Sequence, residues 1–416
     1  MARLSRRCSP RYYKRVNTQQ LLEAAERSLL FVTDREPAVM QSGSGMYLED
    51  SSGKRYLDFV GGWAVTGLGH SPVELAEALS LQAGKLLNAS PAFYNVPMIE
   101  FATAITAEAG LSRVFFCSSG AEANESAIKL ARKYGKVCKG GAYEILCAEH
   151  GFHGRTLATM SASGKAAFRP LFEPKVPGFR HLPFNDATAF EKAIGDETCA
   201  VLLEPIQGEA GVYPATQDFI ERVRSRCSET DTLLIFDEIQ TGMGRTGRMF
   251  AFEHYDIKPD ILTLGKNIGG GFPLAAMLCT EELNLFDKGE QGGTYTGQPL
   301  AMAVGLAVLR TLKERNLVQN AEHMGALVQQ RLSKLVAEFG LSKIRGNGLL
   351  IAFDLPEPKG PDLVHRCFER GLLLNAPAPT VVRLVPPLII EESHIEEMIT
   401  VLTEVMRELG VAGAPS

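Results

Sequence analysis

The sequence predicts an α/β protein whose central, mostly parallel sheet carries helices on both faces. Between residues 112 and 280, short apolar runs alternate with stretches of helical periodicity, which is typical of repeated βαβ units. Two of the runs end in ionisable groups, one in Asp237 and the other in Lys266. Because open α/β sheets bind ligands in the crevice beyond the ends of their strands, we expect this acid and this amine to face one site.

The central strands and helices follow from these runs in order. The runs are short and rich in Ile, Leu and Phe, as buried strands of a parallel sheet are. Strands are expected at residues 114–117, 143–148, 200–204, 233–237, 261–265 and 275–280. Helices are expected between them at residues 121–136, 154–161 and 216–228.

The two flanks of this central part have an α+β pattern. Residues 45–59 predict a β-hairpin around a glycine turn, and residues 299–340 predict a long helical stretch with a break near Asn316. The remaining expected elements are a strand at 348–354, a helix at 362–370, a strand at 382–386 and a final helix from Glu392. We therefore expect an N-terminal arm and hairpin (1–60) that belongs to a small domain, a large domain (61–305) and a C-terminal small α+β domain (306–416).

The composition is typical of a soluble globular protein. Hydrophobic residues make up 45% and charged residues 22% of the chain, and the net charge is -5, so we expect no nucleic-acid or anionic-membrane partner. No apolar run approaches the roughly 20 residues of a membrane span.

The cysteines and the N-terminal segment bear on the compartment. The eight cysteines are scattered without a C-x-x-C pair, which predicts buried, reduced thiols in a cytoplasmic protein. The basic segment from Arg3 to Arg15 is not followed by an apolar run, so it is not expected to be a secretory signal. We expect a loosely ordered arm, with an Arg-rich transit peptide as the alternative.

A turn of small residues follows the first central strand. Residues 118–125 read Ser-Ser-Gly-Ala-Glu-Ala-Asn-Glu and open a helix. Small residues let backbone N–H groups approach a phosphate, and the helix dipole favours its negative charge. A plain turn is the alternative, since Gly and Ser are common in turns.

The segment His150-Gly-Phe-His-Gly-Arg155 follows another predicted strand. Two histidines three residues apart are compatible with a metal site, but no third ligand has supporting spacing, so a metal is not expected. Phe152 would lie on a planar ring, and Arg155 would bind a carboxylate through its fork of donors. A surface ion pair is the alternative for Arg155.

Two acids come at the end of the strand at 200–204 and just beyond it. Glu204 and Glu209 lie in the sequence Glu-Pro-Ile-Gln-Gly-Glu-Ala-Gly, where they fit an acid/base pair or partners for an arginine. For Glu204 we favour capping of backbone groups and turn formation. The glycine-rich segments 242–247 and 269–273 let the backbone approach a ligand closely. In isolation, Lys266 would be interpreted as an ordinary lysine after a strand.

Taken together, these motifs resemble those of class III (ω-type) aminotransferases of fold type I, which use pyridoxal 5'-phosphate (PLP). The resemblance covers residues 46–401 and is strongest to the acetylornithine and ornithine aminotransferase branch. Its most specific motifs are Ser119-Gly-Ala-Glu-Ala-Asn-Glu, Phe152-His-Gly-Arg, Glu204-Pro-Ile-Gln-Gly-Glu-Ala-Gly, Phe236-Asp-Glu-Ile-Gln-Thr-Gly-Met-Gly-Arg-Thr-Gly, Leu264-Gly-Lys-Asn-Ile-Gly-Gly-Gly-Phe-Pro and Gly293-Thr-Tyr-Thr-Gly-Gln-Pro.

The resemblance assigns roles by position. Lys266 and Asp237 would be catalytic: the lysine forms a Schiff base with PLP and moves a proton, and the acid holds the pyridine nitrogen. The other cofactor-binding residues would be Ser119, Gly120 and Ala121 at the phosphate, Phe152 on the ring, Gln240 near the ring hydroxyl, and Thr294 at the phosphate of the neighbouring subunit in a homodimer with active sites at the interface. The substrate-binding residues would be Trp63, Arg155, Glu209 and Arg383.

The activity that the resemblance implies is transfer of the terminal amino group of an N-acetylornithine-like ω-amino acid to 2-oxoglutarate, by a ping-pong mechanism. Arg155 would bind the carboxylate far from the reacting amine, and Arg383 would bind the α-carboxylate of glutamate or 2-oxoglutarate. Glu209 would pair with Arg383 when an ω-amine donor occupies the site, since an unpaired arginine in a dry site costs on the order of several kcal/mol. The carboxylate of the keto acid would then replace Glu209.

The chain departs from this family at two positions. Ala121 stands where a Thr is frequent, so we expect weaker cofactor retention. Trp63, the only Trp, would line the donor side or only pack the hairpin. Ornithine, N-succinylornithine, a lysine-biosynthesis intermediate and 4-aminobutyrate are therefore alternative donors, whereas Arg155 argues against a plain diamine.

Two other classes of function stay open. An aminomutase of the same superfamily needs no keto-acid acceptor, and Arg383 with Glu209 argues against it. A non-catalytic PLP-bound protein is the second alternative, and the presence of both Lys266 and Asp237 argues against that.

Overall fold

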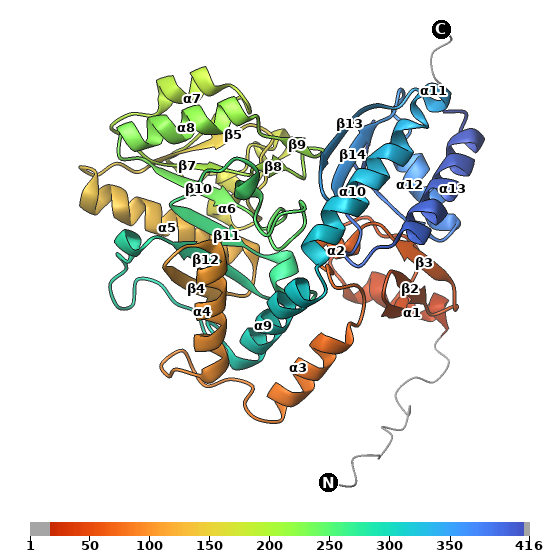
Figure 1. Cartoon of the computed structure of the whole chain (residues 1–416), viewed down its shortest axis with the longest axis horizontal. Helices are drawn as coiled ribbons and strands as arrows, with labels where there is room; N and C mark the ends of the chain where they lie inside the picture. The colour runs from red at the N-terminus through yellow and green to blue at the C-terminus, as the bar shows by residue number, and fades with distance from the viewer. Residues whose placement is uncertain (1–16, 412–416) are drawn as a thin grey trace.

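The centre of the molecule is a twisted seven-stranded sheet (Figure 1). The computed structural model describes residues 17–411, so the predicted basic arm lies outside the described residues. In spatial order the strands are β4 (Arg113–Cys117), β12 (Ala275–Cys279), β11 (Ile261–Leu264), β10 (Leu233–Asp237), β7 (Thr198–Leu203), β5 (Glu144–Ala148) and β6 (Phe179–Leu182). All six predicted central strands are therefore confirmed within a few residues at their ends.

One strand of this sheet, β12, runs against the other six. It pairs antiparallel with both of its neighbours, β11 and β4, and every other pairing is parallel. Only residues 265–274 join β11 to β12. A parallel crossover needs a dozen or more residues, so this short connection forces the chain to return in the opposite direction.

Helices cover both faces of the sheet, as predicted. Alternate side chains of β10 show the division: Leu233 and Ile235 pack into the apolar cluster under α5 (Gly120–Cys138), whereas Leu234 and Phe236 pack into the larger cluster that includes Phe219 of α8 (Gln217–Glu229). This alternation is the two-residue period of a strand buried on both sides. The fold class is therefore confirmed as α/β with a mostly parallel sheet between helical layers.

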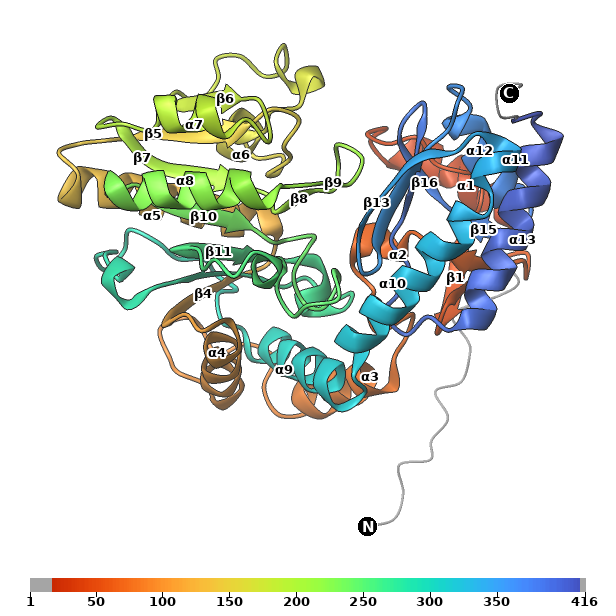
Figure 2. The same cartoon turned by 45° about the horizontal axis from the view of Figure 1, so that its top comes forward.

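The flanking segments form smaller sheets beside the large one, and both views show them together on one side (Figures 1 and 2). One sheet has the order β1-β2-β3-β15 and the other β13-β14-β17-β16. The strands are β1 (Met40–Ser44), β2 (Tyr47–Asp50), β3 (Arg55–Asp58), β13 (Ser342–Asn347), β14 (Leu350–Asp354), β15 (Leu372–Leu373), β16 (Asn375–Ala378) and β17 (Val381–Leu384). Because β15 pairs with β3, residues from both ends of the chain share one sheet.

The helices of the C-terminal flank agree with the prediction. The break at Asn316 is confirmed: its φ of 52° is left-handed, and it separates α9 (Pro299–Glu314) from α10 (Leu317–Ser333). The other helices are α1 (Thr18–Ser28), α2 (Gly61–Ala64), α3 (Val73–Ala83), α4 (Val96–Ala109), α6 (Leu157–Ala162), α7 (Ala187–Ala193), α11 (Val336–Phe339), α12 (Gly360–Glu369) and α13 (Glu392–Glu408). A two-stranded ribbon, β8 (Ile206–Gln207) with β9 (Tyr213–Pro214), completes the described elements.

Some expectations were wrong in detail. The helix expected at 154–161 begins only at Leu157, because the residues before it are extended and Gly154 has a φ of 139°. Several elements were not predicted: the helices α1, α2, α3, α4 and α7, and the strands β1, β6, β8, β9, β13, β15 and β16. These differences leave the layered architecture unchanged.

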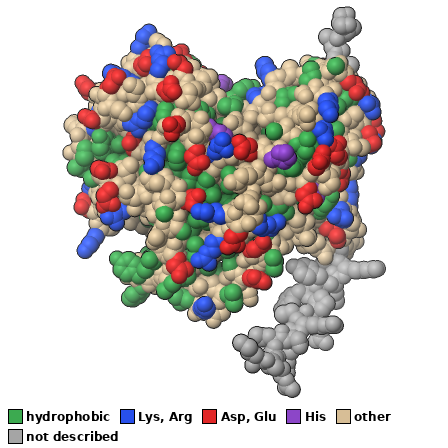
Figure 3. Space-filling model, viewed as in Figure 1, with side chains coloured by type: hydrophobic (Ala, Val, Ile, Leu, Met, Phe, Trp, Pro, Cys, Tyr) green, Lys and Arg blue, Asp and Glu red, His purple; other side chains and the backbone are tan. Residues whose placement is uncertain are grey.

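The face of the molecule drawn in Figure 3 carries basic and acidic side chains interspersed over both lobes. Among residues 17–411, no helix combines the length and the apolar character needed to cross a membrane.

Candidate active site

A cavity of about 200 Å³ lies where the chain leaves several parallel strands of the large sheet. Its lining comes from the segments that follow β4, β5, β7, β10 and β11. The structure brings together here seven of the residues predicted to form the site: Gly120, Ala121, Phe152, Glu209, Asp237, Gln240 and Lys266. The expectation that Asp237 and Lys266 face one crevice is therefore confirmed.

The turn between β4 and α5 supplies the helix N-terminus at this cavity. Ser119 is the N-cap of α5, and its hydroxyl and backbone N–H both contact the Glu122 carboxylate, at 3.0 and 2.8 Å. A Cβ on Gly120 would come within 2.8 Å of Ile239, so only glycine leaves this wall undisturbed. Since the first amides of a helix have no intrahelical partner, the N–H groups of Gly120 and Ala121 are suited to an anionic group.

The carboxylate of Asp237 is held by buried donors. Its Oδ2 accepts hydrogen bonds from Asn124 Nδ2 at 2.7 Å and pairs with His153 Nδ1 at 2.8 Å, and its Oδ1 accepts the N–H of Ile239 at 3.1 Å. Burial lowers the pKa of His153, but the hydrogen bond and charge of Asp237 outweigh this and raise it above its usual value. The imidazole therefore donates a hydrogen bond to the Asp237 carboxylate, and it does so from a buried position.

Lys266 enters the cavity from the turn after β11. Its φ of 48° is left-handed, a strained conformation for a residue with a side chain and one that is concentrated at functional sites. Burial lowers the pKa of its amine. The negative charge of Glu209 raises this pKa and the positive charge of Arg383 lowers it further, and the resulting pKa is about 8. The neutral amine, which can act as a nucleophile or base, is therefore far more populated near neutral pH than for an ordinary lysine.

Glu209 and Arg383 form an ion pair beside Lys266. Arg383 Nη1 donates to Glu209 Oε1 at 2.7 Å and to the carbonyl of Gly208 at 2.8 Å, and Gln240 Nε2 donates to the same Glu209 oxygen at 3.2 Å. Burial raises the pKa of Glu209, but the charges of Arg383 and Lys266 and the hydrogen bonds lower it to about 2. Arg383 Nη2 is buried and has no hydrogen-bond partner among the described residues, so the guanidinium can accept a further anionic ligand.

Glu204 has the backbone role that the sequence favoured, and it also lines the cavity. Its Oε1 accepts the N–H of Phe152 at 2.8 Å, which fixes the position of that ring. Burial raises the pKa of Glu204. The charge of His153 lowers this pKa and that of Asp237 raises it, and the net result is a pKa of about 7. Its carboxyl therefore titrates near neutral pH within the site.

Trp63 lies in a left-handed turn. Gly61, Gly62, Trp63 and Ala64 all have φ between 56° and 66°, which costs roughly 1–2 kcal/mol for each residue with a side chain. The indole is 50% exposed, and the Arg383 guanidinium lies 5.7 Å from its ring centre. The ring therefore covers the arginine from the solvent side, although it is not among the residues that line the cavity.

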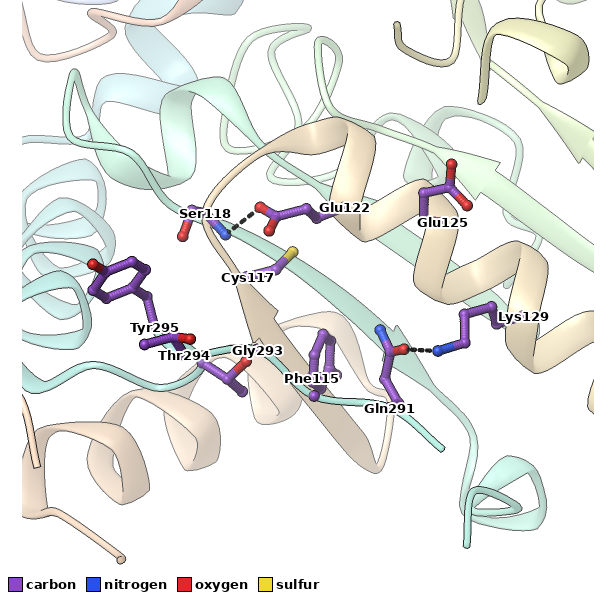
Figure 4. A pocket seen from close by; sticks show the side chains of 12 residues that line it. Phe115, Cys117, Ser118, Glu122, Glu125, Lys129, Gln291, Gly293, Thr294 and Tyr295 are labelled. Atoms are coloured by element: carbon purple, nitrogen blue, oxygen red, sulfur yellow. Dashed lines mark hydrogen bonds between the residues drawn. The ribbon is translucent and has the colours of Figure 1, made fainter. Parts of the chain in front are cut away.

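Two predicted site residues lie away from the cavity. Arg155 is exposed, with its guanidinium 5.4 Å from the ring centre of Phe168. Thr294 lines a separate, larger pocket of about 440 Å³ together with Ser118 and Glu122 (Figure 4). Within one chain, neither residue contributes to the lining of the cavity around Lys266.

Some residues of the site escaped the sequence analysis. His153 was considered only as a metal ligand, and among the described residues no group of three His, Cys, Asp or Glu side chains is placed to bind a metal ion. Asn124 joins Asp237 to Thr263, whose hydroxyl donates to Asn124 Oδ1 at 2.8 Å. Ile239 adds an apolar wall. The available signal was that Asn124 is a polar residue four positions after Gly120, on the helix face expected to meet the sheet.

Comparison with known proteins gives consistent results. The family described as aminotransferase class-III matches residues 32–406. The chain is 49% identical to the acetylornithine aminotransferase of Ralstonia nicotianae, over 92% of this chain and 98% of that protein. It is 44% identical to the acetylornithine aminotransferase of Gloeobacter violaceus, over 94% of this chain and 98% of that protein.

Solved structures are similar in fold over nearly the whole chain. The ornithine aminotransferase of Toxoplasma gondii ME49 superposes with a TM-score of 0.91 at 30% identity, covering 95% of this chain and 96% of that chain. The acetylornithine aminotransferase of Elizabethkingia anophelis superposes with a TM-score of 0.85 at 33% identity, covering 94% of this chain and all of that chain.

Proposed function

The chain belongs to the class-III aminotransferase family, and we propose that it moves the terminal amino group of an N-acetylornithine-like ω-amino acid to 2-oxoglutarate. The observation that carries this proposal is the Glu209–Arg383 ion pair beside the buried amine of Lys266. The identity to acetylornithine aminotransferases supports the choice of donor.

The residues of the cavity fit pyridoxal 5'-phosphate as the cofactor. A buried amine of low pKa is suited to a Schiff base, the helix N-terminus at Gly120 and Ala121 is suited to the phosphate, and Asp237 is suited to the ring nitrogen. Phe152 and Ile239 supply apolar walls for a flat ring. When bound, this cofactor supplies an electron sink for the electrons of the substrate carbon.

Each residue then has a defined task. Asp237, fixed by Asn124 and His153, keeps a proton on the ring nitrogen. Lys266, in its neutral form, takes a proton from the substrate carbon that bears the amino group. Glu204 holds Phe152 in place through its backbone N–H. The buried walls exclude water and so strengthen these electrostatic interactions.

The Glu209–Arg383 pair allows one site to serve two substrates in turn. A donor that enters with its terminal amine has no carboxylate at this point, so Glu209 neutralises Arg383. The α-carboxylate of glutamate or 2-oxoglutarate binds Arg383 instead, helped by the free donors on Nη2. Arg155 would bind the distant carboxylate of the donor, and Trp63 would narrow the entrance above Arg383.

We also propose a homodimer in which Thr294 reaches the cofactor phosphate of the partner. Thr294 is exposed and is separated from the cavity of its own chain. Exposed apolar side chains lie nearby: Tyr295, the next residue, is 61% exposed, and Tyr94, which lines a pocket with Thr296, is 86% exposed. An apolar surface of this kind is typical of a protein–protein interface.

Ornithine is the second candidate donor. The similarity of the whole fold to the ornithine aminotransferase of Toxoplasma gondii supports it. The two donors differ at the α-amino group, which is acylated in N-acetylornithine and free in ornithine. Their relative kcat/KM values decide between them.

The test is a visible absorption spectrum of the purified protein, recorded before and after addition of N-acetylornithine and then of 2-oxoglutarate. A cofactor band that changes with the donor and returns with the keto acid, with one glutamate formed per turnover, is expected. A band that ignores N-acetylornithine but responds to glutamate would contradict the proposed donor, and ornithine, N-succinylornithine and 4-aminobutyrate would then be compared. Turnover without any keto acid would contradict transamination itself.

A further inference from the structure

One face of α5 carries a row of polar side chains that the chemistry above does not use. Glu122, Ser126, Lys129 and Lys133 are spaced by three or four residues, so they lie one above the other along the helix. The row begins at the turn that would bind the cofactor phosphate and runs away from it for about three turns.

At the start of the helix, the row is bonded to the phosphate turn. Glu122 Oε2 accepts the backbone N–H of Ser118 at 3.0 Å, a contact drawn in Figure 4. It also accepts the backbone N–H of Ser119 at 2.8 Å. Ser126 Oγ donates to the carbonyl of Glu122 at 2.7 Å. The turn and the row are therefore parts of one hydrogen-bonded unit.

Further along the helix, the same row holds the segment just before Thr294. Gln291 Nε2 donates to Ser126 Oγ at 2.6 Å. Lys129 donates to the carbonyl of Glu290 at 2.5 Å and to the side-chain oxygen of Gln291, a contact drawn in Figure 4. The last anchored residue thus lies three positions before Thr294.

Lys133 adds a second point of attachment. Its Nζ forms ion pairs with Asp287 at 2.7 Å and Glu290 at 2.9 Å, and its side chain is only 19% exposed. Glu290 in turn accepts the backbone N–H of Asp287 at 2.9 Å. Lys133 is therefore a shielded cation shared by two more exposed acids, and a network of several charges is the case in which surface ion pairs contribute measurably.

The stretch between this anchor and Thr294 has little support of its own. Gly292 and Gly293 follow Gln291, and a Cβ on Gly292 would meet no atom within 4 Å. Glycines have a large conformational freedom, so ordering them is unfavourable. On its other side Thr294 belongs to a turn before α9, in which the N–H of Thr296 donates to the carbonyl of Gly293 at 3.2 Å. The anchor at residues 287–291 therefore fixes the position of this turn relative to α5.

We infer that Lys129 and Lys133 are positioning residues for Thr294, and that α5 links the phosphate turn of one subunit to the phosphate site of its partner. This inference rests on the proposed homodimer in which Thr294 reaches the partner's cofactor. It predicts that a change at Lys129 or Lys133 weakens cofactor binding in the neighbouring subunit and leaves the cofactor of its own subunit unaffected.

The first experiment measures the dissociation constant of PLP from the dimer. Lys129→Met and Lys133→Met are each expected to weaken PLP binding about threefold to tenfold, as expected for a lost charge-assisted contact in a partly exposed network. Lys129→Arg should retain most of the affinity. Lys136→Met is the matched control, since Lys136 lies on the same helix, is exposed and makes no hydrogen bond or ion pair with the described residues.

The second experiment uses hybrid dimers in which Lys266→Ala silences one site, so that the absorbance of PLP attached to lysine reports only on the other. Paired with a Lys266→Ala subunit, a Lys129→Met subunit should retain PLP as the wild type does, because the Thr294 that reaches its PLP belongs to the partner, in which Lys129 is intact. Paired with a Lys129→Met/Lys266→Ala subunit, a wild-type subunit should lose PLP as readily as the Lys129→Met homodimer. The reverse pattern, or equal retention in both hybrids, would overturn the inference.

Thr294→Ala separates this inference from its premise. If Thr294→Ala weakens PLP binding in a dimer and both lysine variants bind PLP as the wild type does, only the inference fails. If the protein sediments as a monomer, or Thr294→Ala binds PLP as tightly as the wild type, the proposed dimeric site fails and the inference with it.

Discussion

The two acids Asp237 and Glu209 lie on the same cavity but in opposite kinds of surroundings. Asp237 is buried among donors that belong to the rigid core: a helix side chain, a histidine and a backbone N–H. Glu209 is held by Arg383, which comes from β17 on the smaller part of the molecule, and by the side chain of Gln240. The first acid has fixed partners, whereas the second has one charged partner, Arg383, to which a substrate carboxylate can bind in its place.

The difference corresponds to two tasks. The proton on the ring nitrogen must stay in place through both half-reactions, so a donor network that cannot rearrange is suited to Asp237. The carboxylate pocket must be neutral for one substrate and positive for the other, so a pair that can separate is suited to Glu209 and Arg383. Lys266 lies between the two regions and responds to the charges of both.

Removal of the residue between the two regions should have the largest effect. We expect Lys266→Ala to lower turnover by about 10,000-fold and to abolish the absorbance of lysine-attached cofactor, since the same amine attaches the cofactor and moves the proton. The measurement is the steady-state rate together with the visible spectrum. Lys258→Ala, at an exposed lysine, is the control and should leave both unchanged. An active Lys266→Ala enzyme would refute the assignment of the catalytic amine.

A change in the fixed region should affect both substrates alike. We expect Asp237→Asn to slow both half-reactions by about 100- to 1,000-fold, because a neutral amide no longer stabilises a protonated ring nitrogen. Single-turnover rates with the ω-amine donor and with glutamate measure the two losses separately. Asp256→Asn, at an exposed acid, is the control. Losses that differ more than a few-fold between the two substrates would break the distinction between the regions.

The sequence predicted most of the fold because buried strands carry continuous apolar runs. It missed β6 and β13, which both lie at the edge of their sheets. An edge strand is partly solvated and its sequence need not be apolar: β6 reads Phe-Arg-His-Leu and β13 reads Ser-Lys-Ile-Arg-Gly-Asn. The direction of β12 was not encoded in its own residues, since it follows from the length of the connection before it.

The site was predictable where function lies in a local motif. Lys266 and Asp237 each end an apolar run, and this pattern is visible within ten residues. The hydrogen bonds that hold Asp237 could not be predicted in this way, because Asn124 and His153 lie 113 and 84 positions before it in the sequence. Such contacts depend on strand order, which periodicity does not give. The roles of Arg155, Thr294 and Trp63 stay predictions, since they depend on contacts with the substrate or with a partner subunit.

A change in the exchangeable region should separate the two substrates. Glu209→Gln keeps the shape of the side chain and removes its charge, so Arg383 is left uncompensated whenever the donor brings no carboxylate to it. We expect kcat/KM for N-acetylornithine to fall about tenfold more than kcat/KM for glutamate, which neutralises Arg383 itself. Equal losses with both substrates would remove the argument for a replaceable pair.

The smallest effect, and the one that compares the two acids most directly, concerns the pH at which Lys266 becomes reactive. PLP attaches only to a neutral amine, so its rate of attachment to the cofactor-free protein should rise with pH through a midpoint near 8. Burial lowers the pKa of Lys266, whereas both acids raise it, and Glu209 does so more than Asp237. In Glu209→Gln the positive charge of Arg383, which lowers the pKa of Lys266, is no longer compensated. Both variants should therefore have a lower midpoint than the wild type, and the shift should be larger in Glu209→Gln than in Asp237→Asn. Stopped-flow absorbance between pH 6 and 10 measures the three midpoints. A larger shift in Asp237→Asn would mean that the fixed acid, rather than the exchangeable one, controls the amine.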